Sequence, residues 1–392
     1  MSPVDLVVLL LAVAFAVGGY RQGLISSVLS FVGFVGGAAI GTQLATPIAT
    51  NVAHGRAQTV VAVAVVLGCA LIGQLITVPL GAALRDRLVW RPARAVDSVL
   101  GAITSALTLL IVAWMIATPL ASSPYPDVSA AVRRSDVIKG VDDAMPSPLR
   151  SVYNSLRDVI DRSEFPAVFG PLDPTKVAPV KAPDPRLLQS PVVQQVRASI
   201  VKVNGLAPSC SRRIEGSGFV YAPGRVMTNA HVVAGTDSVN VEVDGTERTA
   251  TVVVYDADRD VAVLSVPGMQ APPLAFAGSP ADRGDDAIIA GYPGDGPFFV
   301  GAARIRQRED IRGPNIYQSH QVTRDVYTVR GDVRSGNSGG PLLTPNGHVY
   351  GVIFAAAVDQ SDTGFALTAA EVSDDAHTGT QAGSAVSTGA CD

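Results

Sequence analysis

One short stretch constrains the architecture of this chain more than any other: Ser335-Gly336-Asn337-Ser338-Gly339-Gly340-Pro341-Leu342. Glycines lie on both sides of Ser338, so the backbone can form a tight turn that exposes the Ser338 hydroxyl. The same turn leaves the backbone N–H groups of Gly336 and Ser338 free to point at a developing oxyanion. Taken alone, the stretch is equally compatible with an ordinary Gly/Ser-rich loop.

Two stretches upstream carry the side chains that a serine nucleophile needs. His231 lies in Thr228-Asn229-Ala230-His231-Val232-Val233, after the Gly-rich run Gly216-Ser217-Gly218-Phe219-Val220. Just after a strand, a histidine is well placed to act as a general base near pH 7. Asp260 directly precedes the apolar run Val261-Ala262-Val263-Leu264, where a buried carboxylate can accept a histidine N–H.

Each of these residues has a simpler interpretation when taken alone. A lone histidine is usually a core or surface residue, and Asp260 resembles an ordinary turn aspartate with Asp256 and Asp258 as close competitors. We prefer Asp260 because it abuts the strand, which fixes its geometry. The order His, Asp, Ser along one chain makes the set far more specific than any of its members.

The background of these motifs is β-rich. From Val193 onward, short β-branched runs alternate with Gly, Pro, Asn and Asp, which is typical of an all-β sandwich or barrel pair. The predicted strands are Ser199–Val203, Gly218–Tyr221, Ser238–Val243, Thr249–Val254, Val261–Val266, Ala287–Ala290, Val326–Val329 and Val349–Phe354.

Together, these motifs resemble the trypsin/chymotrypsin-fold serine proteases, and most closely the bacterial periplasmic HtrA-like branch, over about residues 195–370. The resemblance implies an all-β chymotrypsin-like pair of six-stranded antiparallel barrels with the catalytic triad in the cleft between them. His231 and Asp260 would belong to the first barrel and Ser338 to the second.

The sequence departs from the wider family at two places. Digestive trypsins carry an Asp before the nucleophile, which pairs with a new N-terminus after zymogen cleavage; here Asn337 stands there, so we expect no such switch. HtrA proteases carry a peptide-binding PDZ domain after the protease, whereas only a short segment follows Leu367, so we do not expect PDZ gating. Asp332 has the offset of a basic-specificity pocket, but the loop lengths are bacterial, which leaves specificity open.

The composition requires a second kind of domain in front. The chain is 47% hydrophobic and only 16% charged, against about 25% charged in a typical soluble domain. Residues 1–121 contain no Lys and no Glu. The formal net charge of −4 argues against a nucleic-acid partner, which would need a basic face. Three cysteines and five histidines show no metal-ligand spacing, so we expect no metal and no organic cofactor.

The uncharged runs in this front third are long enough to cross a bilayer as helices. Three of them, 22–55, 57–84 and 98–126, exceed the ~20 residues that a span needs, whereas Leu6–Tyr20 is marginal. A cleaved signal peptide is the alternative for the first run, but it lacks a basic n-region and further apolar runs follow. We therefore predict an all-α domain with spans near 4–20, 24–48, 58–83 and 97–121.

Arginine placement predicts the orientation of these spans. The 84–96 connection contains Arg85, Arg87, Arg91 and Arg94 against one Asp, which indicates the cytoplasmic side. The N-terminus and everything after residue 121 then face outward, which predicts a multi-pass protein of the inner membrane with its β domain in the periplasm. Glycines at four-residue spacing, Gly33, Gly37 and Gly41, indicate close helix packing, within the domain or as a dimer seam.

The membrane domain also resembles a known family. Asp5 and the run Gly19-Tyr20-Arg21-Gln22-Gly23-Leu24 resemble the colicin V production protein family over roughly residues 1–120. Four such spans followed by this protease resemble the membrane-anchored mycobacterial and actinobacterial acid-resistance proteases. That resemblance implies an extracytoplasmic protease involved in acid and oxidative stress tolerance.

Between the two domains we predict a Pro-rich linker with short amphipathic helices. Ten prolines lie between residues 122 and 190, a density that favours extended chain. Within it, Pro148–Asp161 has the apolar periodicity of an amphipathic helix. The expected domains are therefore 1–121, 122–190 and 191–392, and the linker is a candidate for autocleavage.

The cysteines suggest one disulfide. Cys69 lies in the middle of a predicted span, whereas Cys210 and Cys391 lie on the outward side, where disulfides persist. We expect Cys210 and Cys391 to pair, because the polar tail Ser373–Ala390 has little else to hold it.

The sequence therefore predicts an extracytoplasmic serine endopeptidase with catalytic His231, Asp260 and Ser338 and an oxyanion hole formed by Gly336 and Ser338. Its expected partners are extracytoplasmic proteins or peptides and the lipid bilayer, with no nucleic acid. The alternative is a membrane sensor or scaffold whose protease-like domain binds peptides without turnover.

Overall fold

The computed structural model describes residues 2–52, 56–87, 90–121, 126–146, 168, 175, 177–208, 212–243 and 245–391. The chain divides into two compact units. The helical unit comprises residues 1–123 and 131–162, and the barrel unit comprises residues 124–130 and 163–392.

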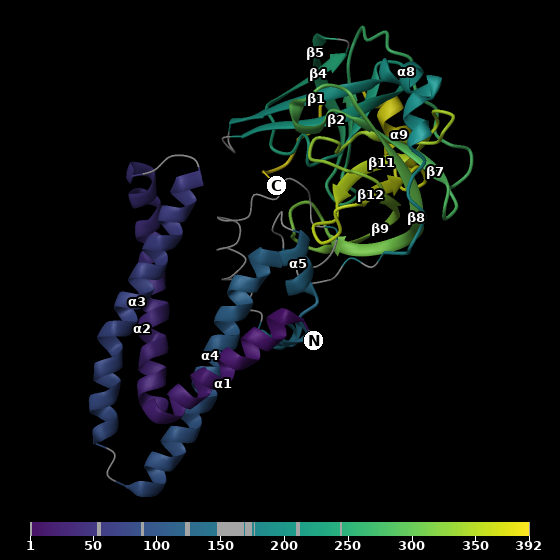
Figure 1. The fold of residues 1–392 in the computed structure, drawn as a ribbon. Helices are drawn as coiled ribbons and strands as arrows, with labels where there is room; N and C mark the ends of the chain where they lie inside the picture. The colour runs from purple at the N-terminus through teal and green to yellow at the C-terminus, as the bar shows by residue number, and fades with distance from the viewer. Residues whose placement is uncertain are drawn as a thin grey trace. The chain divides into compact units, whose positions relative to one another are not determined.

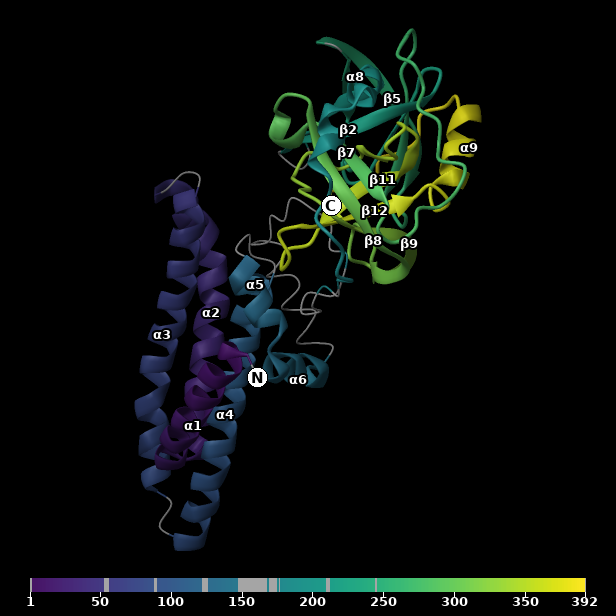
Figure 2. The ribbon, with the colours of Figure 1, turned by 45° about the vertical axis from the view of Figure 1, so that its right-hand side comes forward.

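Four long helices form most of the helical unit (Figure 1). They are α1 (Pro3–Gln22), α2 (Leu24–Val52), α3 (Arg56–Asp86) and α4 (Arg91–Ala121). All four contain a window long and apolar enough to cross a membrane, which agrees with the four predicted spans. In both views α2 and α3 run side by side as a hairpin, and α1 lies along α4 (Figure 2).

The glycine ridge of α2 packs inside this unit. A Cβ added to Gly33 would lie 2.5 Å from the carbonyl oxygen of Gly73, and one on Gly41 would lie 2.8 Å from the Cα of Val66. Both partners are on α3, so the small residues allow the two helix backbones to approach closely. Of the two predicted uses of the ridge, packing within the domain is the one that the structure contains.

Two short helices, α5 (Pro126–Arg133) and α6 (Asp136–Ala144), lie where we expected the linker to begin. The start of α6 contacts the start of α1 through one buried carboxylate. Asp5 accepts hydrogen bonds from the Ser2 N–H at 2.7 Å, the Ser135 hydroxyl at 2.5 Å and the Val137 N–H at 3.2 Å. The helical unit therefore continues past residue 121. The predicted amphipathic helix Pro148–Asp161 lies outside the described residues.

The barrel unit contains two closed six-stranded barrels, which confirms the predicted fold class. The first barrel has the order β1 (Ile200–Ala207), β2 (Arg212–Ala222), β3 (Arg225–Thr228), β6 (Val261–Ser265), β5 (Thr246–Asp256) and β4 (Ser238–Val243). The second has the order β10 (Pro341–Leu343), β11 (Val349–Ala356), β12 (Thr363–Thr368), β9 (Gln321–Arg330), β8 (Phe299–Pro314) and β7 (Asp286–Gly291). The paired neighbours are antiparallel throughout.

Every predicted strand is present, and the structure adds β3, β8, β10 and β12. β3 and β10 were missed because they have only four and three residues, and β8 because it is rich in charged residues. β12 was missed because its sequence, TGFALT, contains Gly and Ala in place of a β-branched run. The unit also contains η1 (Pro185–Gln189), α8 (Pro191–Arg197), η3 (Pro293–Asp295) and α9 (Ser373–Gln381).

Strands between the barrels are buried on both faces. In β6, Ala262 and Leu264 belong to the interior of the first barrel, whereas Val261 and Val263 pack into a cluster shared with residues of the second barrel, such as Phe354. A strand that is buried on both faces reads as a continuous apolar run rather than an alternating one. The core that joins the barrels therefore also fixes the strand that follows Asp260.

The C-terminal segment is held more firmly than we expected. We predicted a polar tail with little to hold it, and this prediction is wrong. Arg225 on β3 donates from Nε to the carbonyl of Gly379 at 2.7 Å, the Val386 N–H donates to the carbonyl of Val252 at 2.9 Å, and the Gly235 N–H donates to the carbonyl of Thr388 at 3.0 Å. Hydrogen bonds to backbone groups of this segment attach it to the first barrel. Such bonds do not depend on apolar side chains, so the sequence pattern could not predict them.

Candidate active site

The first barrel brings His231 and Asp260 together. His231 Nδ1 lies 2.8 Å from Asp260 Oδ2 and 3.0 Å from Oδ1, and the His231 backbone N–H donates to Oδ1 at 3.0 Å. Asp260 is fully buried and His231 is 7% exposed. A carboxylate that accepts the Nδ1 proton leaves Nε2 with its lone pair, which is the tautomer a general base requires.

Two side chains, those of Asn229 and Arg324, hold the backbone around Asp260, whose φ of 63° is unusual for a residue with a side chain. The Asn229 side-chain amide donates to the Asp260 carbonyl at 2.7 Å. From the second barrel, Arg324 donates through Nε to the carbonyl of Asp258 at 2.7 Å and through Nη2 to that of Pro314 at 3.1 Å. These contacts keep the catalytic-acid candidate in a conformation that it would not favour alone.

Arg324 is also a buried positive charge close to Asp260. Burial lowers the pKa of Arg324, and the carboxylate of Asp260 acts in the opposite direction. The guanidinium lies 6.0 Å from the ring centroid of Phe354. Sequence reasoning missed Arg324, because nothing local distinguishes it from the other arginines of β8 and β9.

The competitors of Asp260 are engaged elsewhere. Asp256 accepts from the backbone N–H groups of Asp258 and Arg259, both at 2.8 Å, and so caps the turn. Asp258 lies 3.0 Å from His320 Nε2 and accepts from the Asn315 side chain. Asp260 is thus the member of the three that contacts His231.

The second barrel supplies the nucleophile turn before β10. Gly336 and Gly339 have φ angles of 88° and 81°, which glycine adopts readily and other residues rarely do. Ser338 is 3% exposed, and its Oγ makes no hydrogen bond within the described part of the chain. Catalytic hydrogen bonds often close only when substrate binds.

The peptide groups of this turn have fixed orientations. The carbonyl of Ser335 accepts from the Gly294 N–H at 2.9 Å, and that of Asn337 accepts from the Gly340 N–H at 2.9 Å. In a trans peptide the C=O and the following N–H point in opposite directions. The N–H groups of Gly336 and Ser338 therefore point away from these two partners, and no described hydrogen bond occupies them.

The nucleophile turn contacts β2 and β3 of the first barrel. The Ser217 N–H donates to the Ser338 carbonyl at 2.8 Å, and the Thr228 hydroxyl donates to the Ser217 carbonyl at 2.7 Å. A Cβ on Gly339 would lie 3.0 Å from the Cα of Thr228, three residues before His231. The segments that carry the candidate base and nucleophile are therefore adjacent where the two barrels join.

Two further predictions from the sequence concern Asp332 and the cysteines. Asp332 is 54% exposed and forms an ion pair with the guanidinium of Arg334, so its charge is already compensated. Cys210 lies outside the described residues, so its pairing with Cys391 stays a prediction. The free cysteine of the described part is Cys69, on α3.

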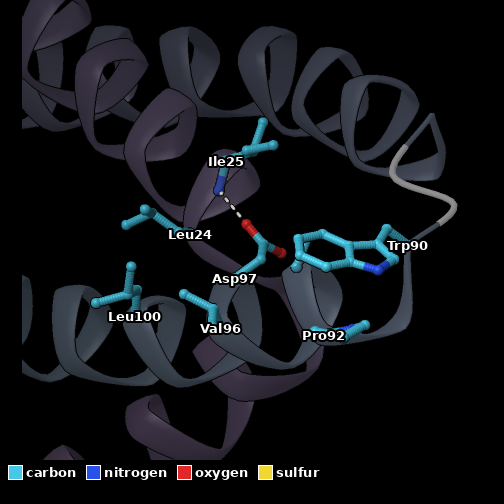
Figure 3. Close-up of a pocket in the computed structure, with 8 residues that line it drawn as sticks. Leu24, Ile25, Trp90, Pro92, Val96, Asp97 and Leu100 are labelled. Atoms are coloured by element: carbon cyan, nitrogen blue, oxygen red, sulfur yellow. Dashed lines mark hydrogen bonds between the residues drawn. The ribbon is translucent and has the colours of Figure 1, made fainter.

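A pocket in the helical unit offers no competing site. Figure 3 shows Asp97 among apolar side chains at the start of α2 and α4, including Leu24, Trp90 and Leu100. Asp97 accepts from the Ile25 N–H at 3.1 Å and pairs with Arg85 at 3.0 Å. Its carboxylate is therefore engaged. Among the described residues, no three His, Cys, Asp or Glu side chains cluster as metal ligands would.

Two antiparallel six-stranded barrels with a nucleophile turn at their junction define the class of trypsin-like serine proteases. Family comparison agrees, because the trypsin-like peptidase domain matches residues 216–352. The colicin V production protein family matches residues 4–146, so that it extends through α5 and α6.

The chain belongs to the family of serine protease Rv3671c of Mycobacterium tuberculosis, to which it is 44% identical over 370 residues, with 94% of this chain and 93% of that protein covered. The crystal structure of the active form of the Rv3671c protease covers 57% of this chain and 99% of its own, at 50% identity and a TM-score of 0.55. A probable periplasmic DegP-like serine endoprotease of Chlamydia pneumoniae is 32% identical over 150 residues, which cover 37% of this chain and 29% of that protein. The chain is therefore a serine protease, and its four apolar helices indicate a multi-pass membrane protein.

Proposed function

We propose that the chain is an extracytoplasmic, membrane-anchored endopeptidase that cleaves proteins through a Ser338 acyl-enzyme. The observation that carries this proposal is the buried His231–Asp260 pair, at 2.8 Å, beside a nucleophile turn whose Gly336 and Ser338 N–H groups are unoccupied in the described structure. A domain that only bound peptides would have no need for this arrangement.

In the proposed reaction, His231 Nε2 takes the proton from Ser338 Oγ as this oxygen bonds to the peptide carbonyl carbon. The Gly336 and Ser338 N–H groups stabilise the resulting oxyanion, and Asp260 stabilises the imidazolium. The C–N bond then breaks, and His231 gives the proton to the leaving amine. Water, deprotonated by His231, hydrolyses the ester and restores Ser338. At the end of the cycle His231 is neutral again and Ser338 carries its proton again.

A serine-directed probe tests this mechanism against the alternative of a peptide-binding sensor or scaffold. A fluorophosphonate is expected to label the full-length wild-type chain, and Ser338→Ala is expected to remain unlabelled. Ser319→Ala is a matched control, because Ser319 is an exposed serine of the same unit. Unlabelled wild type that still binds peptides would support the sensor instead.

The proposed location rests on the positive-inside rule. Arg87 directly follows α3, and Arg91 and Arg94 lie in the first turn of α4, so three arginines mark this end of the two helices while Arg85 pairs with Asp97. A reporter enzyme that functions only outside the cytoplasm should be active when fused after residue 125. Activity only after fusion near residue 90 would reverse the orientation. With the protease domain outside the cytoplasm, its substrates would be extracytoplasmic proteins. Their cleavage would serve acid and oxidative stress tolerance, as the resemblance to the acid-resistance proteases implies. The linker is a further candidate substrate in cis.

The Cys210–Cys391 disulfide belongs to the same proposal, because an extracytoplasmic location permits it. Closing a loop of this length would stabilise the fold by about 5 kcal/mol in the chain-entropy model, as an upper bound. Mass spectrometry of the non-reduced protein should detect the cross-linked peptide. Two alkylatable thiols at these positions would disprove the bond.

A further inference from the structure

The oxyanion turn of this protease lacks the ion pair that trypsins use. Asn337 stands where digestive trypsins carry the Asp that binds the new N-terminus. Here its Oδ1 accepts from the Arg334 N–H at 2.9 Å, and an amide cannot form an ion pair. Some other charged contact has to determine the orientation of the peptide between Ser335 and Gly336.

That peptide is held from η3, the turn that follows β7. The Gly294 N–H donates to the Ser335 carbonyl at 2.9 Å, which keeps this carbonyl on the η3 side. If the peptide rotated, the Ser335 carbonyl would face the oxyanion position and the Gly336 N–H would leave it. The Gly294 N–H therefore selects the orientation that stabilises an oxyanion.

The η3 turn needs support from outside, since it has three residues and two of them have left-handed φ angles. Gly294 has φ 61° and Asp295 has φ 53°, a region that is unfavourable for a residue with a Cβ such as Asp295. Lys202 of β1 supplies the support: its Nζ lies 2.8 Å from Asp295 Oδ1 and donates to the Asp295 carbonyl at 3.1 Å. The same ammonium lies 5.7 Å from the ring centroid of Tyr292.

This contact is better shielded than a typical surface pair. The Lys202 side chain is 13% exposed and that of Asp295 is 40% exposed. The hydrogen bond to Asp295 raises the pKa of Lys202, and Glu242 and Glu215 add to this more weakly. Because the ordinary pKa of a lysine already lies well above neutrality, Lys202 is charged at neutral pH.

The strand register gives a second, independent support. Lys202 is paired directly with Ser217 of β2, so the two side chains lie on the same face of the β1–β2 pair. The Ser217 hydroxyl donates to the Gly336 carbonyl at 2.6 Å and accepts from the Tyr292 N–H at 2.8 Å. One cross-strand pair of the first barrel thus holds two successive peptides of the second barrel's nucleophile turn.

We propose that Lys202 and Asp295 are positioning residues, whose ion pair fixes η3 so that the Gly294 N–H keeps the Gly336 N–H in the oxyanion hole. This inference rests on the proposed function, in which Gly336 and Ser338 form that hole. It assigns to a contact between the two barrels the task that a new N-terminus performs in trypsins.

The test compares kcat with KM for a chromogenic peptide, using the full-length chain in detergent micelles. Lys202→Met should lower kcat by on the order of 10²-fold, the effect of losing one oxyanion donor, and change KM less than about threefold. Asp295→Asn should do the same, and it covers the case in which Lys202→Met does not fold. Lys181→Met, a change at an exposed lysine of the same unit, should leave both constants unchanged.

A double-mutant cycle separates positioning from general destabilisation. Because both residues act through one contact, Lys202→Met with Asp295→Asn should be no slower than either single variant. The exchanged pair, Lys202→Asp with Asp295→Lys, should recover part of the lost kcat. Independent, multiplying effects, or wild-type kcat in both single variants, would overturn the inference while leaving the proposed function intact. A wild-type chain without turnover or fluorophosphonate labelling would instead reject the proposed function.

Discussion

The two barrels contribute to the site in different ways. The first barrel supplies side chains, His231 and Asp260, which contact each other directly. The second supplies mainly backbone, because Gly336 and Gly339 adopt left-handed conformations around Ser338 and leave two N–H groups available. The comparison teaches that residue type limits function in one barrel, whereas backbone conformation limits it in the other.

This difference has a physical cause. A proton acceptor needs a particular side chain with a particular partner, so a substitution that keeps its shape can still abolish its function. Any residue has an N–H that can bind an oxyanion, but only a residue that tolerates the required φ can aim it. Apart from Ser338 itself, the two barrels should therefore be sensitive to different conservative substitutions, the first to a change of chemical group and the second to an added Cβ.

The largest loss of kcat is expected in the first barrel, from the isosteric substitution of Asp260. Asp260→Asn should lower kcat by about 10⁴-fold, because an amide favours the wrong histidine tautomer. The fold should persist, since Asn tolerates the left-handed backbone at this position. Kinetics together with circular dichroism test both parts.

Asp258→Asn is the matched control, since Asp258 bonds to Asn315 and His320 instead of His231. It should retain kcat within a few-fold. Equal losses in the two variants would show that the aspartates act through turn structure, and the comparison between the barrels would fail.

In the second barrel, adding one methyl group to the nucleophile turn should be enough to lower kcat. Gly336→Ala introduces a Cβ that would lie 2.7 Å from the Gly294 nitrogen and the Tyr292 carbonyl oxygen, at a φ of 88°. The turn has to shift, and kcat should fall by about 10² to 10³-fold as one oxyanion donor is lost. Steady-state kinetics on a peptide substrate measure this loss.

Gly284→Ala controls for backbone strain alone. Gly284 has φ 96°, and a Cβ there meets no atom within 4 Å. It should lower the melting temperature and leave kcat unchanged. Loss of kcat in Gly284→Ala as well would mean that strain, rather than the aim of the Gly336 N–H, limits the second barrel.

The smallest predicted effect is on the pH dependence of stability, and it involves α9, which packs on β3, β5 and β6 of the first barrel. Burial raises the pKa of Asp375 to about 6, with Asp256 contributing in the same direction. The folded state then binds a proton more readily than the unfolded state, so this group's contribution to stability is present at about pH 4 and is lost as pH rises through 6.

The melting temperature of the wild type should therefore fall relative to that of Asp375→Asn as pH rises from 5 to 7, by about 2–4 °C per kcal/mol. Thermal unfolding at both pH values measures it. Parallel pH profiles for the two proteins would contradict the assignment. Asp237→Asn is the control, because Asp237 is an exposed aspartate of the same unit that does not contribute to the shift, and it should show the same pH profile as the wild type.

Much of this protein could be predicted from local patterns. The four spans follow from uncharged length and the strands from β-branched runs, because the hydrophobic effect acts on each segment separately. His231, Asp260 and Ser338 could be proposed for the site because their chemistry is carried by residue type. The tail, by contrast, was misjudged, since backbone hydrogen bonds to Arg225 and to β5 leave no trace in composition.

The sequence by itself determined which groups are able to react and which segments avoid water. The place of Asp260 directly before an apolar strand favoured it over Asp256 and Asp258, but only the tertiary structure showed that it contacts His231, because the contact depends on the direction in which the turn places each carboxylate. It alone brought Arg324 to the Asp258 carbonyl and Lys202 to Asp295, 66 and 93 positions apart in the chain. Hydrogen bonds and ion pairs act over about 3 Å, so their partners are set by how the two barrels close and pack and not by neighbourhood in sequence.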